Sequence, residues 1–311
     1  MLDFVGIGVS KSATSWLAKN LMEHPGVFIP NSKELHFFNG RKVPYDDSLK
    51  YLKNLYKDKI SLFLCGEFTP RYFASREALL RIRESCPDTK IILSLRNPIE
   101  RALSQHKYFV YNKKKENCLN PMKAFKGFYK ADYIDKSLYS ENLRYLLSLF
   151  NSANIKVVFY DDIVTEPQLV FDAVCDFLKI ERMEVLNEKI NRTNSDYKGG
   201  ISLLINFYNK VLLNIDYAAN FKQTKEYKFL QLIGNYRLLR AGFLKLKPLV
   251  QVLGRIESKV INYSMQSLKS DEKISLLSKY FVRDVERLES ILGKDLSHWK
   301  TISDNYINDE Q

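Results

Sequence analysis

The chain opens on a short apolar segment that is followed at once by a polar turn and the start of a helix. Residues 4–8 are apolar or glycine, residues 10–15 are small and polar around Lys11, and an apolar helical face begins at Trp16 and Leu17. A strand that leads directly into a helix points the first backbone amides and the positive end of the helix dipole at the space above the turn. The pattern therefore predicts an anion-binding turn, to which Lys11 adds a full charge.

This pattern begins so early that we expect neither a signal peptide nor an N-terminal membrane anchor before it. A chain of 311 residues with 45% hydrophobic content has enough apolar surface for a large core. No apolar run reaches the roughly 18 residues that a membrane-spanning helix needs. The four cysteines are far apart and form no C-x-x-C pair, which is typical of reduced thiols. We therefore expect a single cytoplasmic domain over residues 1–311.

The charge balance indicates an anionic partner without identifying it. The chain carries 48 Lys and Arg against 36 Asp and Glu, a net charge of +12. Such an excess attracts nucleic acid, an acidic membrane surface or a phosphate-rich cofactor. The sequence shows no His, Cys, Asp or Glu cluster with convincing metal-ligand spacing, so we expect no metal.

Alternating strands and helices predict an α/β fold in the first part of the chain. Apolar, β-branched runs occur at residues 4–8, 62–65, 90–95 and 155–159, with helical stretches between them. This alternation is typical of a parallel β-sheet flanked by helices, and it places the cofactor-binding core in residues 1–190.

The rest of the chain is predicted to be helical. Residues 191–200 are polar and form a connector, and residues 201–262 are basic, aromatic and helix-like, which suits a helical insertion or lid. Residues 270–299 contain a last helix that packs on the core and stops at Gly293. One face of that helix carries Ile274, Leu277, Phe281, Val285, Leu288 and Leu292.

Ligands bind at the carboxyl ends of the strands in an open parallel sheet. The polar turn around Lys11 follows the first strand, the segment 66–72 follows the second, and Arg96 follows the third, with Ser104 two turns into the next helix. Cationic groups at two separate places suit a ligand with two separate phosphates.

Two better-known phosphate loops do not fit this turn. The G-x-x-x-x-G-K-[ST] loop of kinases requires glycines where Val5 and Ser10 stand. The dinucleotide fingerprint G-x-G-x-x-G requires a glycine where Lys11 stands. A nucleotide or small-molecule kinase with a degenerate loop and a non-catalytic glycan- or anion-binding module remain alternatives.

Four blocks, in order, resemble one enzyme family. Residues 11–17 (KSATSWL) resemble the 5′-phosphosulfate loop of sulfotransferases that use 3′-phosphoadenosine 5′-phosphosulfate (PAPS), and residues 95–104 (LRNPIERALS) resemble their 3′-phosphate motif. Residues 33–40 (KELHFFNG) and 66–73 (GEFTPRYF) are similar to blocks of heparan sulfate N- and 3-O-sulfotransferases. Residues 280–299 are similar to the C-terminal end of many bacterial members.

The resemblance implies a P-loop-like fold, PAPS as cofactor with 3′,5′-ADP as product, and definite residue roles. Glu34 is implied as the general base, with His36 assisting it or orienting the acceptor. Lys11 is implied to stabilise the leaving phosphate. The implied cofactor-binding residues are Lys11, Ser12, Ala13, Thr14, Ser15 and Trp16 at the 5′ end, and Arg96 and Ser104 at the 3′ end.

The chain departs from the family pattern at three places. Ala13 replaces a glycine, which predicts a backbone that avoids positive φ at this position. Phe68 replaces a lysine that contacts the acceptor in the heparan sulfate enzymes, which argues against heparan sulfate as acceptor. The third cofactor loop is not evident, and Lys198–Gly200 and Lys259–Asn262 are its two candidates.

The acceptor is the part of the reaction that the sequence specifies least. It is expected to be a hydroxyl or amine of a small molecule, glycan or lipid, and no nucleic acid is expected as partner. Residues 201–262 suit a lid, a dimer surface or a peripheral membrane contact, so the oligomeric state stays open. Glu67 suits either a structural hydrogen bond to a turn or a role in the site.

Overall fold

The structure is a computed structural model that describes residues 2–31, 34–40, 45–110, 115–186 and 268–301. The chain divides into two compact units. The first comprises Met1–His106, Met122–Thr193 and Leu268–Gln311, and the second comprises Lys107–Pro121 and Asn194–Ser267. The predicted connector, the segment 201–262 and both candidates for the third cofactor loop lie outside the described residues.

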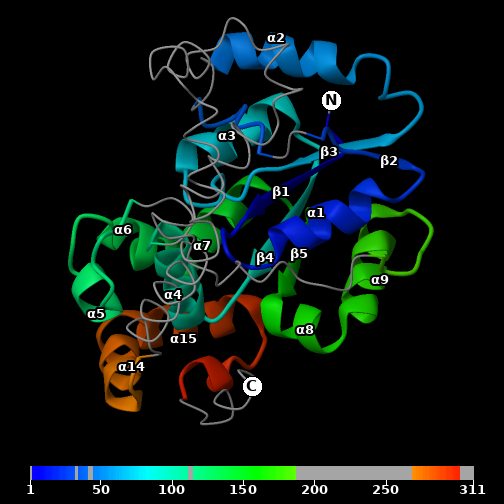
Figure 1. The fold of residues 1–311 in the computed structure, drawn as a ribbon. Helices are drawn as coiled ribbons and strands as arrows, with labels where there is room; N and C mark the ends of the chain where they lie inside the picture. Colours follow the sequence, from blue (N-terminus) through cyan, green and yellow to red (C-terminus); the bar gives the residue numbers. More distant parts are fainter. Residues whose placement is uncertain (1, 32–33, 41–44, 111–114, 187–267, 302–311) are drawn as a thin grey trace, which may run out of the picture. The chain divides into compact units, whose positions relative to one another are not determined.

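The first unit is built on a parallel sheet whose five strands are in the order β2-β3-β1-β4-β5 (Figure 1). All four strand pairs are parallel. The strands are β1 (Phe4–Gly8), β2 (Val27–Phe28), β3 (Leu64–Phe68), β4 (Lys90–Leu95) and β5 (Ile155–Phe159). The predicted parallel α/β fold is confirmed, and β1, β4 and β5 have the bounds predicted for them.

Helices cover both faces of this sheet, as a parallel sheet requires. One core cluster joins α1 and α9 to Phe4 and Ile92, and the other joins α3, α7 and α15 to Val5 and Leu93. The helices are α1 (Thr14–Met22), α2 (Tyr45–Tyr56), α3 (Arg76–Ser85), α4 (Pro98–Tyr108), α5 (Pro121–Ala124), α6 (Lys130–Tyr133), α7 (Ser140–Leu149), α8 (Tyr160–Thr165), α9 (Pro167–Leu178), α14 (Ser270–Leu276) and α15 (Val282–Leu292).

The strand predicted at 62–65 lies further along the chain, at Leu64–Phe68. Leu62 is exposed, and the strand instead includes Gly66 and Glu67. Gly66 faces the Phe4 ring so closely that a Cβ there would lie 2.2 Å from it. A glycine and a charged residue weaken a strand pattern, so this boundary depends on packing that the local sequence does not reveal.

The last helix differs from its prediction at its start. A π-helical turn, Leu277–Phe281, separates α14 from α15. Leu277, Phe281, Val285 and Leu288 are buried as predicted, but Ile274 is 54% exposed. In a π turn each backbone hydrogen bond spans five residues, whereas in an α-helix it spans four. The extra residue rotates the residues before the π turn away from the buried face. Gly293 ends α15 at φ 61, as predicted.

A carboxylate of α15 caps the first turn of α7. Asp284 accepts hydrogen bonds from the amides of Tyr139, at 2.7 Å, and Ser140, at 3.1 Å, and from the Ser140 hydroxyl, at 2.5 Å. The first amides of a helix have no partner within it, and an acid near them is favourable. Asp284 therefore links the C-terminal helix to the core.

We expect Asp284→Ala to lower the free energy of unfolding by about 2 kcal/mol, because it leaves buried amides without partners. Urea unfolding of the full chain measures this change. Asp271→Ala is the matched control, since Asp271 is exposed on α14. Equal midpoints for the two variants would contradict the capping role.

Candidate functional site

Three segments meet at the carboxyl ends of β3, β1 and β4, where the sequence predicts the site. Thr69 N donates to Gly6 O at 2.9 Å, which joins the turn after β3 to β1. Arg96 Nη1 donates to Lys11 O at 3.2 Å, which joins the turn after β4 to the turn after β1. The two segments predicted to bind separate phosphates are therefore in direct contact.

The turn after β1 is fixed by a hydrogen bond from β4 and contains a buried hydroxyl group that could bind a ligand. Ser94 Oγ donates to the Ser12 carbonyl. Ser12 Oγ is buried, and within the described residues it has no hydrogen-bond partner. Arg96 Nε is likewise buried without a partner there. Native proteins rarely leave such groups unsatisfied, so the two atoms suit a ligand with anionic oxygens, and the residues fit a phosphate group.

The prediction for Ala13 is wrong. Its φ is 58 and its ψ is 17, so the N-cap residue of α1 is in the left-handed region that a residue with a Cβ was predicted to avoid. Trp16 N and Leu17 N both donate to Ala13 O, at 2.9 and 3.1 Å. The helix start fixes this conformation in spite of a steric penalty of about 1–2 kcal/mol for a residue with a Cβ.

We expect Ala13→Gly to raise the free energy of unfolding by about 0.5–1 kcal/mol, because relief of the left-handed penalty exceeds the added chain entropy of glycine. Ala18→Gly is the matched control, since Ala18 is buried within α1, and glycine there should lower stability by about 1 kcal/mol. Denaturant unfolding compares the two. A loss of stability in both variants would contradict the strain at Ala13.

The other predicted residues of the turn differ in exposure. Ser15 is partly exposed, whereas Thr14 is 5% exposed and Trp16 is 1% exposed. Trp16 packs edge-on against Phe171 with ring centroids 6.3 Å apart. Its side chain therefore belongs to the core beneath the turn, while Thr14 and Ser15 occupy the first turn of α1.

Arg96 is held by several groups at the end of β4. Its guanidinium lies 4.0 Å from the centroid of the Tyr160 ring, and Nη2 lies 3.6 Å from a carboxylate oxygen of Glu100. Tyr139 donates its hydroxyl proton to Arg96 O at 2.9 Å. Ser104 lies on α4, four residues after Glu100, and helical periodicity places the two on one face. No local motif in the sequence connects Tyr139 or Tyr160 to Arg96, so neither contact is predicted from the sequence.

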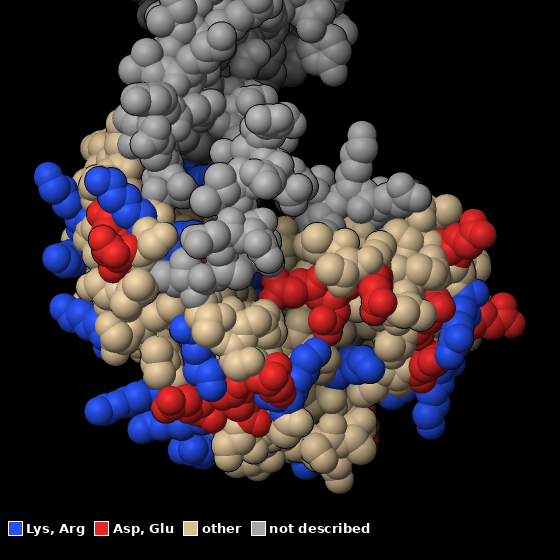
Figure 2. Space-filling view, turned by 90° about the horizontal axis from the view of Figure 1, so that it is seen from below, with Lys and Arg blue, Asp and Glu red and all other residues tan. Residues whose placement is uncertain are grey.

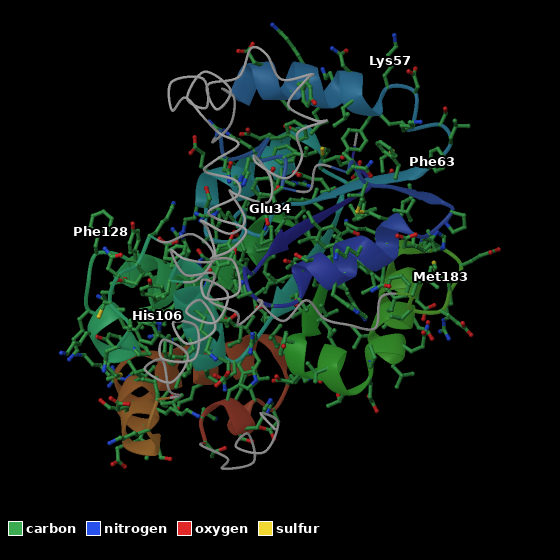
Figure 3. The ribbon with its side chains drawn as sticks, viewed as in Figure 1. Glu34, Lys57, Phe63, His106, Phe128 and Met183 are labelled. Carbon is green, nitrogen blue, oxygen red and sulfur yellow. The ribbon has the colours of Figure 1, made fainter. Side chains whose placement is uncertain are left out.

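Glu34 (Figure 3) and His36 follow β2, and their backbone amides contact the end of β3 and the turn after it. Glu34 N donates to Phe68 O at 3.1 Å, and His36 N donates to Thr69 Oγ1 at 3.4 Å. Glu34 Oε2 is 3.8 Å from His36 Nε2, and the Glu34 side chain is 46% exposed. The Asn39 amide is 3.1 Å from His36 Nδ1. The segment thus presents a carboxylate to solvent beside a buried, oriented imidazole.

Left-handed backbone conformations concentrate in these two segments. Five non-glycine residues in the described part of the chain have positive φ. Lys11, Ala13, Glu34 and His36 belong to the candidate site, and Lys179 ends α9. Such conformations cost about 1–3 kcal/mol each and gather at functional sites. Four of these five positions therefore lie in the two segments that the sequence predicts for the site.

Glu67 has a structural environment. Its carboxylate is 1% exposed and accepts hydrogen bonds from the hydroxyls of Tyr72, at 2.6 Å, and Thr69, at 3.0 Å. Burial, followed by the charge of Glu67, raises the pKa of the Tyr72 phenol above its usual range. Glu67 therefore holds the turn after β3, whose Thr69 contacts His36 N, and this is the structural one of the two roles that the sequence allows for it.

Phe68 is a core residue. It is 1% exposed, and its ring packs edge-on against Phe4 with centroids 6.2 Å apart. The departure from the family lysine at this position is accommodated in the core beneath α1, so Phe68 gives no direct information on the acceptor.

Acidic and basic groups are mixed on the surface. Figure 2 shows Lys and Arg side chains on both flanks of the face it presents and also among the Asp and Glu side chains across its middle. Among the described residues, no group of three or more His, Cys, Asp or Glu is arranged to hold a metal ion. The described helices include none with the length and apolarity to cross a membrane.

Comparison with known proteins identifies a family. A family model for the sulfotransferase domain matches residues 3–231. The human protein "heparan sulfate glucosamine 3-O-sulfotransferase 6" is 30% identical over 184 residues, which are 57% of this chain and 52% of that protein. The Dictyostelium discoideum "membrane-associated sulfotransferase kil1" is 32% identical over 111 residues, which are 35% of this chain and 23% of that protein.

A solved structure agrees in fold. A sulfotransferase from Alicyclobacillus acidocaldarius aligns with a TM-score of 0.65 at 19% identity and covers 97% of this chain and 99% of its own. At this identity the likeness concerns the fold alone. The chain spans about half the length of the human relative.

Proposed function

Because the chain belongs to the sulfotransferase domain family, we propose that it transfers a sulfuryl group from PAPS to a hydroxyl or amine acceptor, with 3′,5′-ADP as product. The family membership disfavours the alternative of a kinase with a degenerate phosphate loop. It also disfavours the alternative of a non-catalytic binding module, because the segments that would carry the chemistry are present in the chain.

The observation that carries the proposal is the contact between the two phosphate-binding segments. Arg96 Nη1 donates to Lys11 O, and Ser12 Oγ and Arg96 Nε are buried without partners in the described part of the chain. A nucleotide with phosphates at its 3′ and 5′ positions needs two anion sites at one edge of the sheet. The positive end of α1 and the charge of Lys11 suit one, and Arg96 with Ser104 suits the other.

When bound, PAPS supplies a sulfuryl group on a phosphate leaving group. Lys11 would neutralise the negative charge that develops on that phosphate, and the amides and hydroxyls of residues 12–15 would hold it in place. Glu34 would accept the proton of the attacking hydroxyl or amine. The protein's remaining task is to align the acceptor with the sulfuryl group.

His36 would act as a positioning residue for Glu34. It is 8% exposed, Asn39 fixes one ring nitrogen at 3.1 Å, and the other faces the Glu34 carboxylate at 3.8 Å. An imidazole fixed in this way limits the rotamers of the Glu34 carboxylate. The carboxylate then spends more time in the orientation that proton transfer from the acceptor requires.

Calorimetry with the full chain tests the cofactor half of the proposal. We expect 3′,5′-ADP to bind and ATP to bind more weakly, because Arg96 and Ser104 suit a 3′-phosphate that ATP lacks. Transfer of labelled sulfate from PAPS to a panel of alcohols, amines, glycans and lipids tests the catalytic half. Tight ATP binding without 3′,5′-ADP binding would favour a kinase, and cofactor binding without transfer to any acceptor would favour a binding module.

A further inference from the structure

The segment that carries Glu34 is attached to the turn after β3 at alternate residues. Three of its amides donate to that turn: Glu34 N to Phe68 O at 3.1 Å, His36 N to Thr69 Oγ1 at 3.4 Å, and Phe38 N to the Tyr72 hydroxyl oxygen at 3.3 Å. The fully buried rings of Phe38 and Tyr72 also pack edge-on, with centroids 5.5 Å apart. Two hydroxyl groups therefore help to fix the segment on which Glu34 lies.

Both hydroxyls are oriented by one buried carboxylate. Tyr72 donates to Glu67 Oε1 at 2.6 Å, Thr69 donates to Glu67 Oε2 at 3.0 Å, and Glu67 is 1% exposed. A hydroxyl has one proton to donate, and its oxygen can also accept. Because Glu67 receives both protons, the lone pairs of the two oxygens remain available to the amides of His36 and Phe38. An ionised carboxylate only accepts hydrogen bonds, so it imposes this orientation on both hydroxyls.

The same turn is bonded to the strand that leads to Lys11. Two of its backbone amides donate to carbonyls of β1: Thr69 N to Gly6 O and Phe73 N to Ile7 O, each at 2.9 Å. These bonds fix the turn to β1, and the two hydroxyls fix the segment of Glu34 to the turn. The network thus connects the proposed base with the strand that precedes the proposed phosphate-binding turn.

The backbone of the attached segment needs such support. Glu34 has a φ of 64 and His36 a φ of 60. Residues with a Cβ keep this conformation only where the surrounding contacts hold them in it. The amides of both residues are among the three that donate to the turn, so loss of these bonds would allow the backbone to relax and Glu34 to move.

We propose that Glu67 is a positioning residue, which acts through Thr69 and Tyr72 to hold Glu34 at a fixed place relative to Lys11. The inference rests on the proposed function, in which Glu34 is the base and Lys11 stabilises the leaving phosphate. A displacement of about 1 Å in such an arrangement lowers the rate by about 10²-fold. Glu67 itself takes no part in bond making or proton transfer.

Hydrogen–deuterium exchange of the full chain, followed by peptide mass spectrometry, tests the network without an acceptor. We expect Glu67→Gln to speed exchange in peptides that cover residues 34–38 by about tenfold, because glutamine offers one acceptor oxygen where the carboxylate offers two. Thr69→Val keeps the shape and removes the hydroxyl, so it should have the same effect, whereas Thr69→Ser should retain the original rate.

Thr89→Val is the matched control for these variants. Thr89 is 2% exposed, and within the described residues its hydroxyl has no hydrogen-bond partner. Its replacement should leave exchange over residues 34–38 and kcat within about twofold of the original values. Unchanged exchange in Glu67→Gln would overturn the proposal, and so would an equal acceleration in Thr89→Val, since the network would then have no specific effect.

A double-variant cycle tests whether Glu67 affects turnover through Glu34. With labelled PAPS and the acceptor that the panel identifies, we expect Glu67→Gln to lower kcat by about 10- to 100-fold and to leave the Kd of 3′,5′-ADP within about twofold. In the Glu34→Gln background, the same substitution should lower kcat by less than about twofold, because no base is left to misplace. Thr69→Val replaces Glu67→Gln in both tests if Glu67→Gln does not fold, since it breaks the same series of bonds.

This inference and the proposed function fail in different ways. If Glu34→Gln lowers kcat and Glu67→Gln lowers it by an equal factor in both backgrounds, Glu67 acts on the fold alone, and only this inference is rejected. If the unaltered chain transfers no label to any acceptor, or if Glu34→Gln leaves kcat unchanged, the proposed function or its base is rejected, and the positioning role with it.

Discussion

Replacing Glu34 with glutamine is expected to lower kcat by about 10²- to 10⁴-fold, the usual contribution of a general base. Glutamine keeps the size of the side chain and the hydrogen bond from the residue 34 amide to Phe68 O, at 3.1 Å. It cannot accept the proton of the attacking group. The loss should therefore appear in kcat, measured with labelled PAPS at saturating acceptor, and not in cofactor affinity.

The affinity for 3′,5′-ADP separates loss of the base from loss of the fold. It should change by less than about twofold in Glu34→Gln, since substitutions away from a contact change free energies by under about 0.5 kcal/mol. Glu84→Gln is the matched control, because Glu84 is exposed on α3. Unchanged kcat in Glu34→Gln would remove Glu34 from the role of base.

Replacing Lys11 with methionine is expected to lower kcat by about 10²- to 10³-fold, the effect of removing one donor from a developing negative charge. Methionine keeps most of the aliphatic length and removes the charge. Because Lys11 would also contact the bound phosphate, the Kd of 3′,5′-ADP should rise by about tenfold or more. Lys11 thus differs from Glu34 in affecting both binding and turnover.

Lys19→Met is the matched control for this change. Lys19 lies on α1, the same helix that begins at the turn, and its side chain is exposed. Its removal should leave both the Kd and kcat within about twofold of the original values. If Lys19→Met weakened 3′,5′-ADP binding as much as Lys11→Met, the effect would come from the general charge of the surface and not from the turn.

The sequence predicts well what depends on neighbouring residues. The strands 4–8, 90–95 and 155–159 have continuous apolar runs, and the helix that begins at Pro98 is capped by Asn97, whose Oδ1 accepts from Ile99 N at 3.0 Å. These signals depend only on residues close together in the chain, so they can be recognised in a single sequence. The parallel order of the strands then brings Lys11 and Arg96 to one edge of the sheet.

The sequence predicts poorly what depends on distant residues. β3 begins at Leu64 and not at residue 62 because Gly66 meets Phe4 and because Tyr72 and Thr69 satisfy the buried Glu67. Ala13 accepts positive φ because the start of α1 requires it. At β3 tertiary contacts outweigh a local preference of about 1 kcal/mol, whereas at Ala13 the hydrogen bonds of the adjoining helix start outweigh the steric penalty of a Cβ.

By itself, then, the sequence determined the parallel α/β architecture, the polar strand-to-helix turn at Lys11 and the place of that turn beside Arg96, since each follows from periodicity, capping and strand order. Only the tertiary structure decided which buried polar groups of the described residues remain unsatisfied and where β3 begins. Those features arise where side chains far apart in the chain approach one another, and no local pattern encodes the approach.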